Sequence, residues 1–357
     1  MIKAEHRFSV LSGVKKFRIR RVLYIALFWT VIDFISTVLN FNTHENHAKS
    51  LFVRAVLVFL MSGVMGYLFV FTLKNIFRES SLAVNFFVKA FILLFAALIM
   101  NFLVHFAESF LITKLGLAGT LSDFLENTMD GNWLLKRTLY WMVLFIVTQL
   151  YVEINDKYAP GVFIDILAGK YIRPKVENRI IMFIDLKDST PIAEKLGHSQ
   201  YFLFIRECIY HVSMALIEHG GIIYQYVGDE IVVSWKYNKT NIKECLRSVL
   251  SARKNIQRNS SRFRRLYGIV PEFHTGIHTG DVTVGEIGII KKDLAMSGDT
   301  MNTTARIRSA CNELNQKFIV SREFAEKSNL KDWQLEDLGS VELKGKAAPI
   351  ELFALKI

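Results

Sequence analysis

The chain has few cysteines and no concentrated block of basic residues. Its 357 residues include three cysteines (Cys208, Cys245 and Cys311), with no C-x-x-C spacing. This excludes a disulfide framework and is typical of reduced thiols in a cytosolic domain. Dividing the chain after Lys157 gives 16 Lys and Arg against 10 Asp and Glu, then 28 against 23, so the net charge of +11 splits into +6 and +5. This even spread predicts no nucleic-acid partner.

Long apolar runs dominate the first half. The sequence is 51% hydrophobic and contains 28 Phe, which is too apolar for a soluble enzyme of this length. The first three runs are long enough to cross about 30 Å of hydrocarbon, while Lys136 and Arg137 interrupt the start of the fourth. We therefore predict a membrane domain over residues 22–154 with four transmembrane helices. They are expected at 22–39, 51–73, 90–112 and 133–154.

Basic residues around these runs predict the orientation. Residues 1–21 form a basic tail, and no small-x-small cleavage signal follows the first apolar run, so we expect a retained anchor. The second connection carries Lys74 and Arg78, whereas the third carries three carboxylates. The positive-inside bias then places both termini in the cytoplasm. We expect a multi-pass protein of the inner or plasma membrane, with the lipid bilayer as a partner.

Several ionisable residues lie within the predicted spans: Asp33, Arg54, His105 and Glu108. Charges inside a bilayer are costly, so such side chains usually face a partner helix or a cavity. His105 and Glu108 are three residues apart and share a helix face. They are a candidate proton- or ligand-sensing site. The alternatives are an interhelical pair or interfacial snorkelling.

Two apolar runs in the second half each end in a carboxylate. Residues 180–184 lead into Asp185, and residues 222–235 form a predicted hairpin with Asp229 at its tip. Each aspartate alone is compatible with a plain turn or cap residue. If the runs are neighbouring strands of one sheet, however, the two carboxylates lie side by side at one edge. Paired oxygen ligands are what hard divalent cations require.

A helix start follows the first of these carboxylates. Ser189 and Thr190 form a polar turn before Pro191, which occupies a favourable first helical position. Free N–H groups at a helix N-terminus bind phosphates. Together with the paired carboxylates, this start predicts a Mg-nucleotide site in which Ser189 and Thr190 contact the nucleotide.

The order of predicted elements after residue 179 is strand, helix, two strands, helix, strand. The helices are expected near 191–219 and 241–262. The last apolar runs, around 271–278 and 282–287, are expected to be broken by Gly280 and Asp281. This order is the ferredoxin-like βαββαβ arrangement of an α+β domain. It places the first strand beside the hairpin and so favours contact between the two aspartates.

A third motif, SGDTMNTTARIR at residues 297–308, follows the stretch FHTGIHTGDVTVGEIG at 273–288. Asn302 and Arg306 are four residues apart and therefore share a helix face. An amide and a guanidinium placed in this way can hold a ribose and a pentavalent phosphate. The N-x-x-x-R spacing carries no information alone, but after the two acidic turns and IHTGD it is specific.

With these motifs, residues 179–357 resemble the class III nucleotidyl cyclases, that is, the adenylyl and guanylyl cyclases. The resemblance implies a cyclase catalytic domain after a membrane domain, and residues 155–178 resemble the transducing element that links the two in many members of this family. It also implies a homodimer that converts ATP to cyclic AMP, or GTP to cyclic GMP, in signal transduction. A passive tether is an equally compatible reading of the linker.

The resemblance assigns roles to individual residues. Asp185 and Asp229 would bind two divalent ions per site, Mg²⁺ or Mn²⁺, with the carbonyl of Leu186 as an added ligand. Asn302 and Arg306 match the transition-state pair, which in this family comes from the opposite subunit. Lys344 matches the lysine that meets the terminal phosphates, although Lys346 is close enough to leave this choice open.

The positions that select the base depart from the family pattern. Gln225 stands where adenylyl enzymes usually have Lys and guanylyl enzymes Glu. Ala295 stands where the partner is usually Asp, Thr or Cys. Because Gln can both donate and accept while Ala can do neither, these residues do not decide the base, and Asp293 is a possible substitute. We favour ATP over GTP. The alternatives are a catalytically silent nucleotide-binding receptor and a diguanylate cyclase. The stretch YVGDEIVV resembles the signature turn of the diguanylate cyclases.

Overall fold

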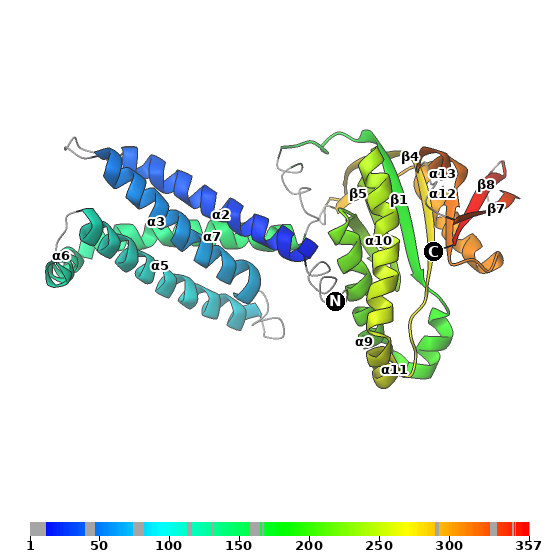
Figure 1. The fold of residues 1–357 in the computed structure, drawn as a ribbon, viewed down its shortest axis with the longest axis horizontal. Coiled ribbons are helices and arrows are strands. Elements are labelled where there is room, and N and C mark those ends of the chain that lie inside the picture. Colours follow the sequence, from blue (N-terminus) through cyan, green and yellow to red (C-terminus); the bar gives the residue numbers. More distant parts are fainter. Residues whose placement is uncertain are drawn as a thin grey trace, which may run out of the picture. The chain divides into compact units, whose positions relative to one another are not determined.

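The structure is a computed structural model. It describes residues 12–39, 47–73, 82–112, 116–129, 131–157, 165, 168–289, 293–328, 334–344, 346 and 348–356. The chain divides into two compact units, Met1–Lys157 and Tyr158–Ile357 (Figure 1).

The first unit is helical. Two of its stretches, Arg18–Leu39 and Leu51–Phe71, are long and apolar enough to cross a membrane, and a third, Phe91–Val104, is shorter. Among the described residues, two of the four predicted spans therefore meet this requirement of length and composition. The helices are α2 (Ser12–Leu39), α3 (His47–Tyr67), the π-helical turn η1 (Leu68–Leu73), α5 (Leu82–Ile112), α6 (Leu117–Met129) and α7 (Gly131–Lys157).

Polar side chains inside the first unit pair between helices. Arg54 on α3 donates to Asp33 on α2 through two bonds, Nε to Oδ2 at 2.8 Å and Nη2 to Oδ1 at 3.0 Å. Both residues are buried. A bidentate pair of this kind satisfies two charges that an apolar environment would otherwise penalise. The other two ionisable residues singled out in the sequence, His105 and Glu108, belong to α5, but their side chains lie outside the described residues.

The second unit is a mixed sheet with helices on both faces. The strand order is β2-β3-β1-β4-β6-β8-β7, and β5 pairs with β4. The predicted βαββαβ order is confirmed by β1, α9, β2, β3, α10 and β4, and further elements follow. The bounds are β1 (Lys175–Leu186), α9 (Ser189–Glu218), β2 (Ile222–Val227), β3 (Glu230–Lys236), α10 (Lys239–Arg258), α11 (Ser260–Tyr267), β4 (Phe273–Ile287), β5 (Asp293–Ser297), α12 (Asp299–Glu313), β6 (Phe318–Ser321), α13 (Arg322–Ser328), β7 (Gln334–Val341) and β8 (Ile350–Lys356).

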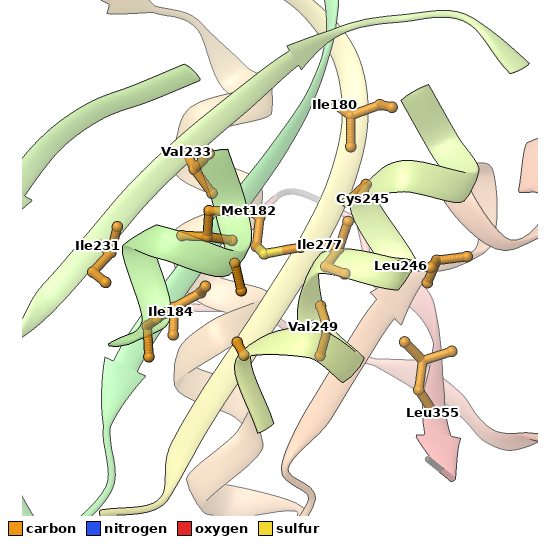
Figure 2. Close-up of a cluster of buried hydrophobic side chains, with 14 of the residues drawn as sticks. Ile180, Met182, Ile184, Ile231, Val233, Cys245, Leu246, Val249, Ile277 and Leu355 are labelled. Carbon is orange, nitrogen blue, oxygen red and sulfur yellow. The ribbon is translucent and has the colours of Figure 1, made fainter. Parts of the chain in front are cut away.

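Strand β1 lies between β3 and β4, antiparallel to both. Its side chains alternate between the two faces, as the pleat requires. Ile180, Met182 and Ile184 join the main core under α9 and α10 (Figure 2). Ile181 and Phe183 pack on the opposite face, in a cluster that includes residues of β5 and α12. By the same alternation, Asp185 belongs to the face that carries α12.

Strand β4 corrects one expectation from the sequence. Gly280 and Asp281 do not interrupt it, because the strand is continuous and these residues pair with Arg179 and Asn178 of β1. A Cβ at position 280 would lie 2.6 Å from Oγ1 of Thr300, so Gly280 makes room for α12. An isolated glycine in a strand often marks such a close approach instead of a break.

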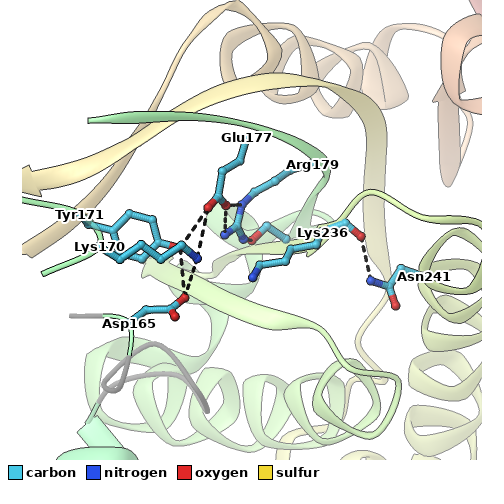
Figure 3. A network of polar contacts seen from close by, with 8 residues as sticks. Asp165, Lys170, Tyr171, Glu177, Arg179, Lys236 and Asn241 are labelled. Atoms are coloured by element: carbon cyan, nitrogen blue, oxygen red, sulfur yellow. Dashed lines mark hydrogen bonds and ion pairs between the residues drawn. The ribbon is translucent and has the colours of Figure 1, made fainter. Parts of the chain in front are cut away.

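A polar network joins the linker to the start of β1 (Figure 3). The Lys170 ammonium lies 2.8 Å from Asp165 Oδ2 and 3.5 Å from Glu177 Oε1. Arg179 is 3% exposed, pairs with Glu177 at 2.6 Å and donates from Nη1 to Ser234 Oγ on β3 at 3.0 Å. The chain therefore enters the sheet through buried or partly buried ionic contacts.

Candidate active site

The edge of the sheet where β1 ends carries the two predicted metal ligands. Asp185 is the penultimate residue of β1, and Asp229 lies in the two-residue turn between β2 and β3. Gly228, with φ of 62°, supplies the left-handed conformation that such a hairpin turn needs. The β1–β3 register ends at Ile184 opposite Ile231, which brings the turn beside Asp185. The two carboxyl groups are close enough for the charge of Asp229 to raise the pKa of Asp185.

This edge is crowded with negative charge. Burial raises the pKa of Asp185 to about 6, Arg308 opposes this rise, and the charges of Asp229 and Glu230 add to it. Burial likewise raises the pKa of Glu230, and Asp229 adds to this rise. A carboxylate group with a raised pKa lacks sufficient positive partners in its surroundings.

The donors present fit a divalent cation. Oδ2 of Asp229 is buried and has no hydrogen-bond partner among the described residues. Carboxylate and carbonyl oxygens are the ligands that Mg²⁺ and Mn²⁺ prefer. Asp185 and Asp229, with the carbonyl of the adjacent Leu186, would hold such an ion. No group of three or more His, Cys, Asp or Glu side chains with the arrangement of a metal site occurs within the described residues.

A polar cavity of about 480 Å³ continues from Asp185 to the start of α9. The residue before this helix, Asp188, has φ of 55° and provides no side-chain cap. Because a helix start leaves its first N–H groups without intrahelical partners, the turn offers uncapped donors. The cavity lining includes both Ser189 and Thr190, together with Asp185, Leu186, Lys187, Asp188, Pro191, His274, Cys311, Asn312 and Asn315.

The predicted transition-state pair lies elsewhere on the chain. Asn302 is exposed and Arg306 half-buried on α12, and neither side chain has a partner among the described residues. A single chain therefore does not bring this pair into contact with Asp185 or Asp229.

Sequence reasoning missed Arg308, which does reach the carboxylates. Its Nη1 donates to Asp185 Oδ2 at 3.0 Å, and its Nη2 lies 2.7 Å from Glu230 Oε2. Each residue of an α-helix turns by about 100°, so the side chains of Arg306 and Arg308 point about 200° apart around α12. Arg308 therefore faces the sheet of the same subunit. Two features of the sequence could have indicated this contact. Arg308 lies two residues after Arg306, on the opposite face of the helix, and Glu230 adds a second carboxylate directly after Asp229.

The positions predicted to select the base lie on strands β2 and β5, which are separated in the sheet by β3, β1 and β4. Gln225 is exposed on β2, and Ala295 is half-buried on β5, opposite Gly285 of β4. The backbone N–H of Met296 donates to the Tyr224 hydroxyl at 3.1 Å, which ties the two strands together one residue away from each position.

The two candidate phosphate lysines differ in their surroundings. Lys346 forms an ion pair with Asp299 at the start of α12. Lys344 is exposed, and its side chain has no partner among the described residues. Lys344 is therefore the one available to a ligand without breaking an existing contact.

Comparisons with known proteins agree with this geometry. The model of the family described as "Adenylate and Guanylate cyclase catalytic domain" matches residues 173–356. Adenylate cyclase 2 of Rhizobium meliloti (strain 1021) is 32% identical over 206 residues, 57% of this chain and 57% of that protein. Adenylate cyclase of Anabaena cylindrica is 22% identical over 219 residues, 56% of this chain and 42% of that protein. The chain thus spans about half the length of these curated relatives.

A solved structure shares the fold. A bacterial light-regulated adenylyl cyclase superimposes with a TM-score of 0.52 at 19% identity, over 61% of this chain and 64% of that one. Since the family match covers more than half of the 357 residues, the chain belongs to the family of the adenylate and guanylate cyclase catalytic domain.

Proposed function

We propose that the protein is a membrane-bound adenylate cyclase that converts ATP to 3′,5′-cyclic AMP and pyrophosphate in signal transduction. The observation that carries this proposal is the placement of Asp185 next to the β2–β3 turn with Asp229, whose buried Oδ2 has no partner among the described residues, beside the uncapped start of α9. Two relatives with the name adenylate cyclase support ATP as the substrate.

The reaction joins the ribose 3′-oxygen to the α-phosphorus and expels pyrophosphate. Two divalent ions, Mg²⁺ or Mn²⁺, would lower the pKa of the 3′-hydroxyl and neutralise the triphosphate. Asp185, Asp229 and the Leu186 carbonyl would hold these ions. Because the ions make the hydroxyl acidic, we assign no side chain as general base.

The remaining residues orient and stabilise the nucleotide. The start of α9, with Ser189 and Thr190, offers N–H groups to the phosphates. Lys344 would meet the terminal phosphates, Asn302 would orient the ribose, and Arg306 would stabilise charge on the α-phosphate, as arginines do in other phosphoryl transfers. Loss of one such electrostatic group typically lowers turnover by about 100- to 1000-fold.

The complete site requires two copies of the chain. Neither Asn302 nor Arg306 has a side-chain partner among the described residues of its own subunit, and neither contacts Asp185 or Asp229 there. In a symmetric homodimer each subunit would give this pair to the other, which creates two equivalent sites. A change in how the two domains meet would then change the rate.

The membrane domain is proposed to have four spans with both termini in the cytoplasm, and Arg18–Leu39 and Leu51–Phe71 support two of them. Cysteine labelling tests this topology with little background, because all three native cysteines are buried. Lys74→Cys should react only from the cytoplasmic side and Asp123→Cys only from the outer side. Reaction of both from one side would exclude four spans. His105 and Glu108 remain a proposed sensing site within this domain.

A guanylate cyclase is the second candidate, because Gln225 is exposed where it can donate to or accept from either base. Product formation from ATP and GTP, measured in parallel on the purified full chain with Mg²⁺ or Mn²⁺, separates the possibilities. We expect cyclic AMP to dominate. Cyclic GMP would identify a guanylate cyclase, cyclic dinucleotide a diguanylate cyclase, and no product a silent receptor.

Two variants sharpen this assay. Asp229→Ala should lower turnover by about 100-fold or more, whereas Glu326→Gln, which removes an exposed carboxylate on α13, should not. Full activity in Asp229→Ala would refute the metal assignment. Gln225→Lys should strengthen the preference for ATP, and an unchanged ratio of the two products would show that this position does not read the base.

A further inference from the structure

We propose that the Arg308 guanidinium competes with divalent ions for the carboxylates at the end of β1, and that it thereby sets the metal affinity of the site. The inference rests on the proposed metal role of Asp185 and Asp229. Arg308 would be a positioning residue that acts through Asp185 and Glu230.

The guanidinium bridges two strands. Nη1 binds Asp185 on β1 at 3.0 Å, and Nη2 lies 2.7 Å from Glu230 on β3. Nε of Arg308 is buried and has no hydrogen-bond partner among the described residues. The carboxylates are therefore the contacts that hold this charge in place, and they include one of the two proposed metal ligands.

The backbone of Arg308 is fixed, while its side chain has a path outward. A Cβ added at Gly276 of β4 would lie 2.8 Å from the Cα of Arg308, so α12 rests directly on the strand at this point. The missing side chain of Gly276 is what permits this close approach. The Arg308 side chain is 22% exposed, however, so it can turn toward solvent without movement of the helix.

The charges at the site make the competition unavoidable. Arg308 occupies Oδ2 of Asp185, and the negative charge of Asp229 acts on the same carboxylate. An ion that joins Asp185 to Asp229 would come within a few ångströms of the guanidinium, where like charges repel strongly at the low effective dielectric of a protein site. Arg308 already acts on this carboxylate, since its charge opposes the rise in the pKa of Asp185.

The test is a titration of the full chain in detergent with Mn²⁺, without nucleotide, in which free Mn²⁺ is followed by its electron paramagnetic resonance signal. Arg308→Met should bind Mn²⁺ at least about tenfold more tightly than the parent chain, because it removes the charge. Arg308→Lys, which keeps the charge, should stay near the parent value. If Arg308→Met does not fold, Arg308→Gln serves in the same titration.

A matched control separates local competition from net charge. Arg322→Met removes the same charge from an exposed position on α13, outside the proposed site, so it should change Mn²⁺ affinity less than about twofold. Affinity in Arg308→Met that is unchanged or weaker than in the parent would overturn the inference. It would show that Arg308 does not exclude the ion.

Failure of the proposed function gives a different result. Asp229→Asn should abolish Mn²⁺ binding in both the parent and the Arg308→Met background. If neither background binds Mn²⁺ through Asp229, the metal site and the inference both fail. If the parent binds through Asp229 and Arg308→Met binds no more tightly, the metal assignment stands and only the competition is wrong.

Discussion

At the scale of single residues, Asp185 links the stability of the domain to its chemistry. Burial, assisted by Asp229 and Glu230, raises the pKa of this carboxyl to about 6. In an unfolded chain the pKa of Asp is about 3.9. Between these two pH values the native state binds more protons at this carboxyl than the unfolded state does. The protonated Asp185 therefore contributes fully to stability below about pH 4, and this contribution is lost as the pH rises through about 6.

Metal binding should show the opposite dependence, because a divalent ion needs the charged carboxylate. We predict that Mn²⁺ affinity of the nucleotide-free chain rises from about pH 5 to about pH 7, with the largest change near the pKa of Asp185. Calorimetric titration at several pH values measures this. Asp185→Asn should remove the step. An affinity that does not change across this range would contradict the assignment.

At the scale of elements, Gly276 determines how α12 sits on the sheet. Its missing side chain allows the Arg308 backbone to approach β4. We predict that Gly276→Ala pushes α12 away and lowers stability by about 1–3 kcal/mol, as overpacking does. Turnover should fall by more than the loss of folded protein explains, because α12 also carries Asn302 and Arg306. Thermal unfolding and product formation measure the two effects.

The control for this substitution is Gly63→Ala in α3, where an added Cβ would have nothing within 4 Å. It should leave both the melting temperature and turnover close to those of the parent chain. A Gly276→Ala chain with parental stability and turnover would show that α12 tolerates displacement and does not set the site.

The polar network between the linker and the start of β1 depends on Arg179. Burial pushes the pKa of Glu177 up, but the hydrogen bond and charge of Arg179, with the charge of Lys170, outweigh it and lower that pKa. Arg179→Met would leave Glu177 and Ser234 without this partner. We predict a loss of about 3 kcal/mol in the free energy of unfolding, measured by denaturant titration.

An exposed arginine provides the comparison. Arg322 on α13 pairs with Glu326 and is 50% exposed, so Arg322→Met should cost less than about 1 kcal/mol. Equal losses in the two variants would argue against a structural role for the linker network. If the linker also transmits changes from the proposed membrane domain, Arg179→Met should alter basal turnover beyond what its lower stability explains.

At the scale of the whole molecule, the proposed dimer makes a quantitative prediction. Asp229→Ala and Arg306→Ala damage different contributors to a shared site, so each homodimer should be nearly inactive. In a mixed dimer one site carries both defects and the other carries none. Random mixing makes half of the dimers mixed, each with one of two sites intact, so about a quarter of the parental turnover should return.

Co-expression of the two variants and assay of the purified mixture measure this recovery. Mixing Asp229→Ala with Asp185→Ala is the control, because both defects fall on the same contributor and no dimer has an intact site. Recovery in neither mixture would mean that the aspartates and the Asn302–Arg306 pair act within one subunit.

Sequence patterns were sufficient for the arrangement of strands and helices that places Asp185 beside Asp229. Alternating apolar residues specify the face of each strand, and the order of elements puts β1 next to the β2–β3 hairpin. The motifs likewise placed Asn302 and Arg306 on one helix. These features follow from local periodicity, which the chain carries within short windows.

The rest depended on contacts between distant segments. The sequence predicted a break between strands at Gly280, because a glycine can mark either a turn or a close approach of another element. Only the position of Thr300 against this glycine shows that it is a close approach. Arg308 was passed over because its partners, Asp185 and Glu230, are distant in the sequence, Asp185 by 123 residues. The sequence by itself determined which groups the chain possesses and which face of an element each occupies. The tertiary structure decided which charges meet, since that depends on how closely α12 approaches β4.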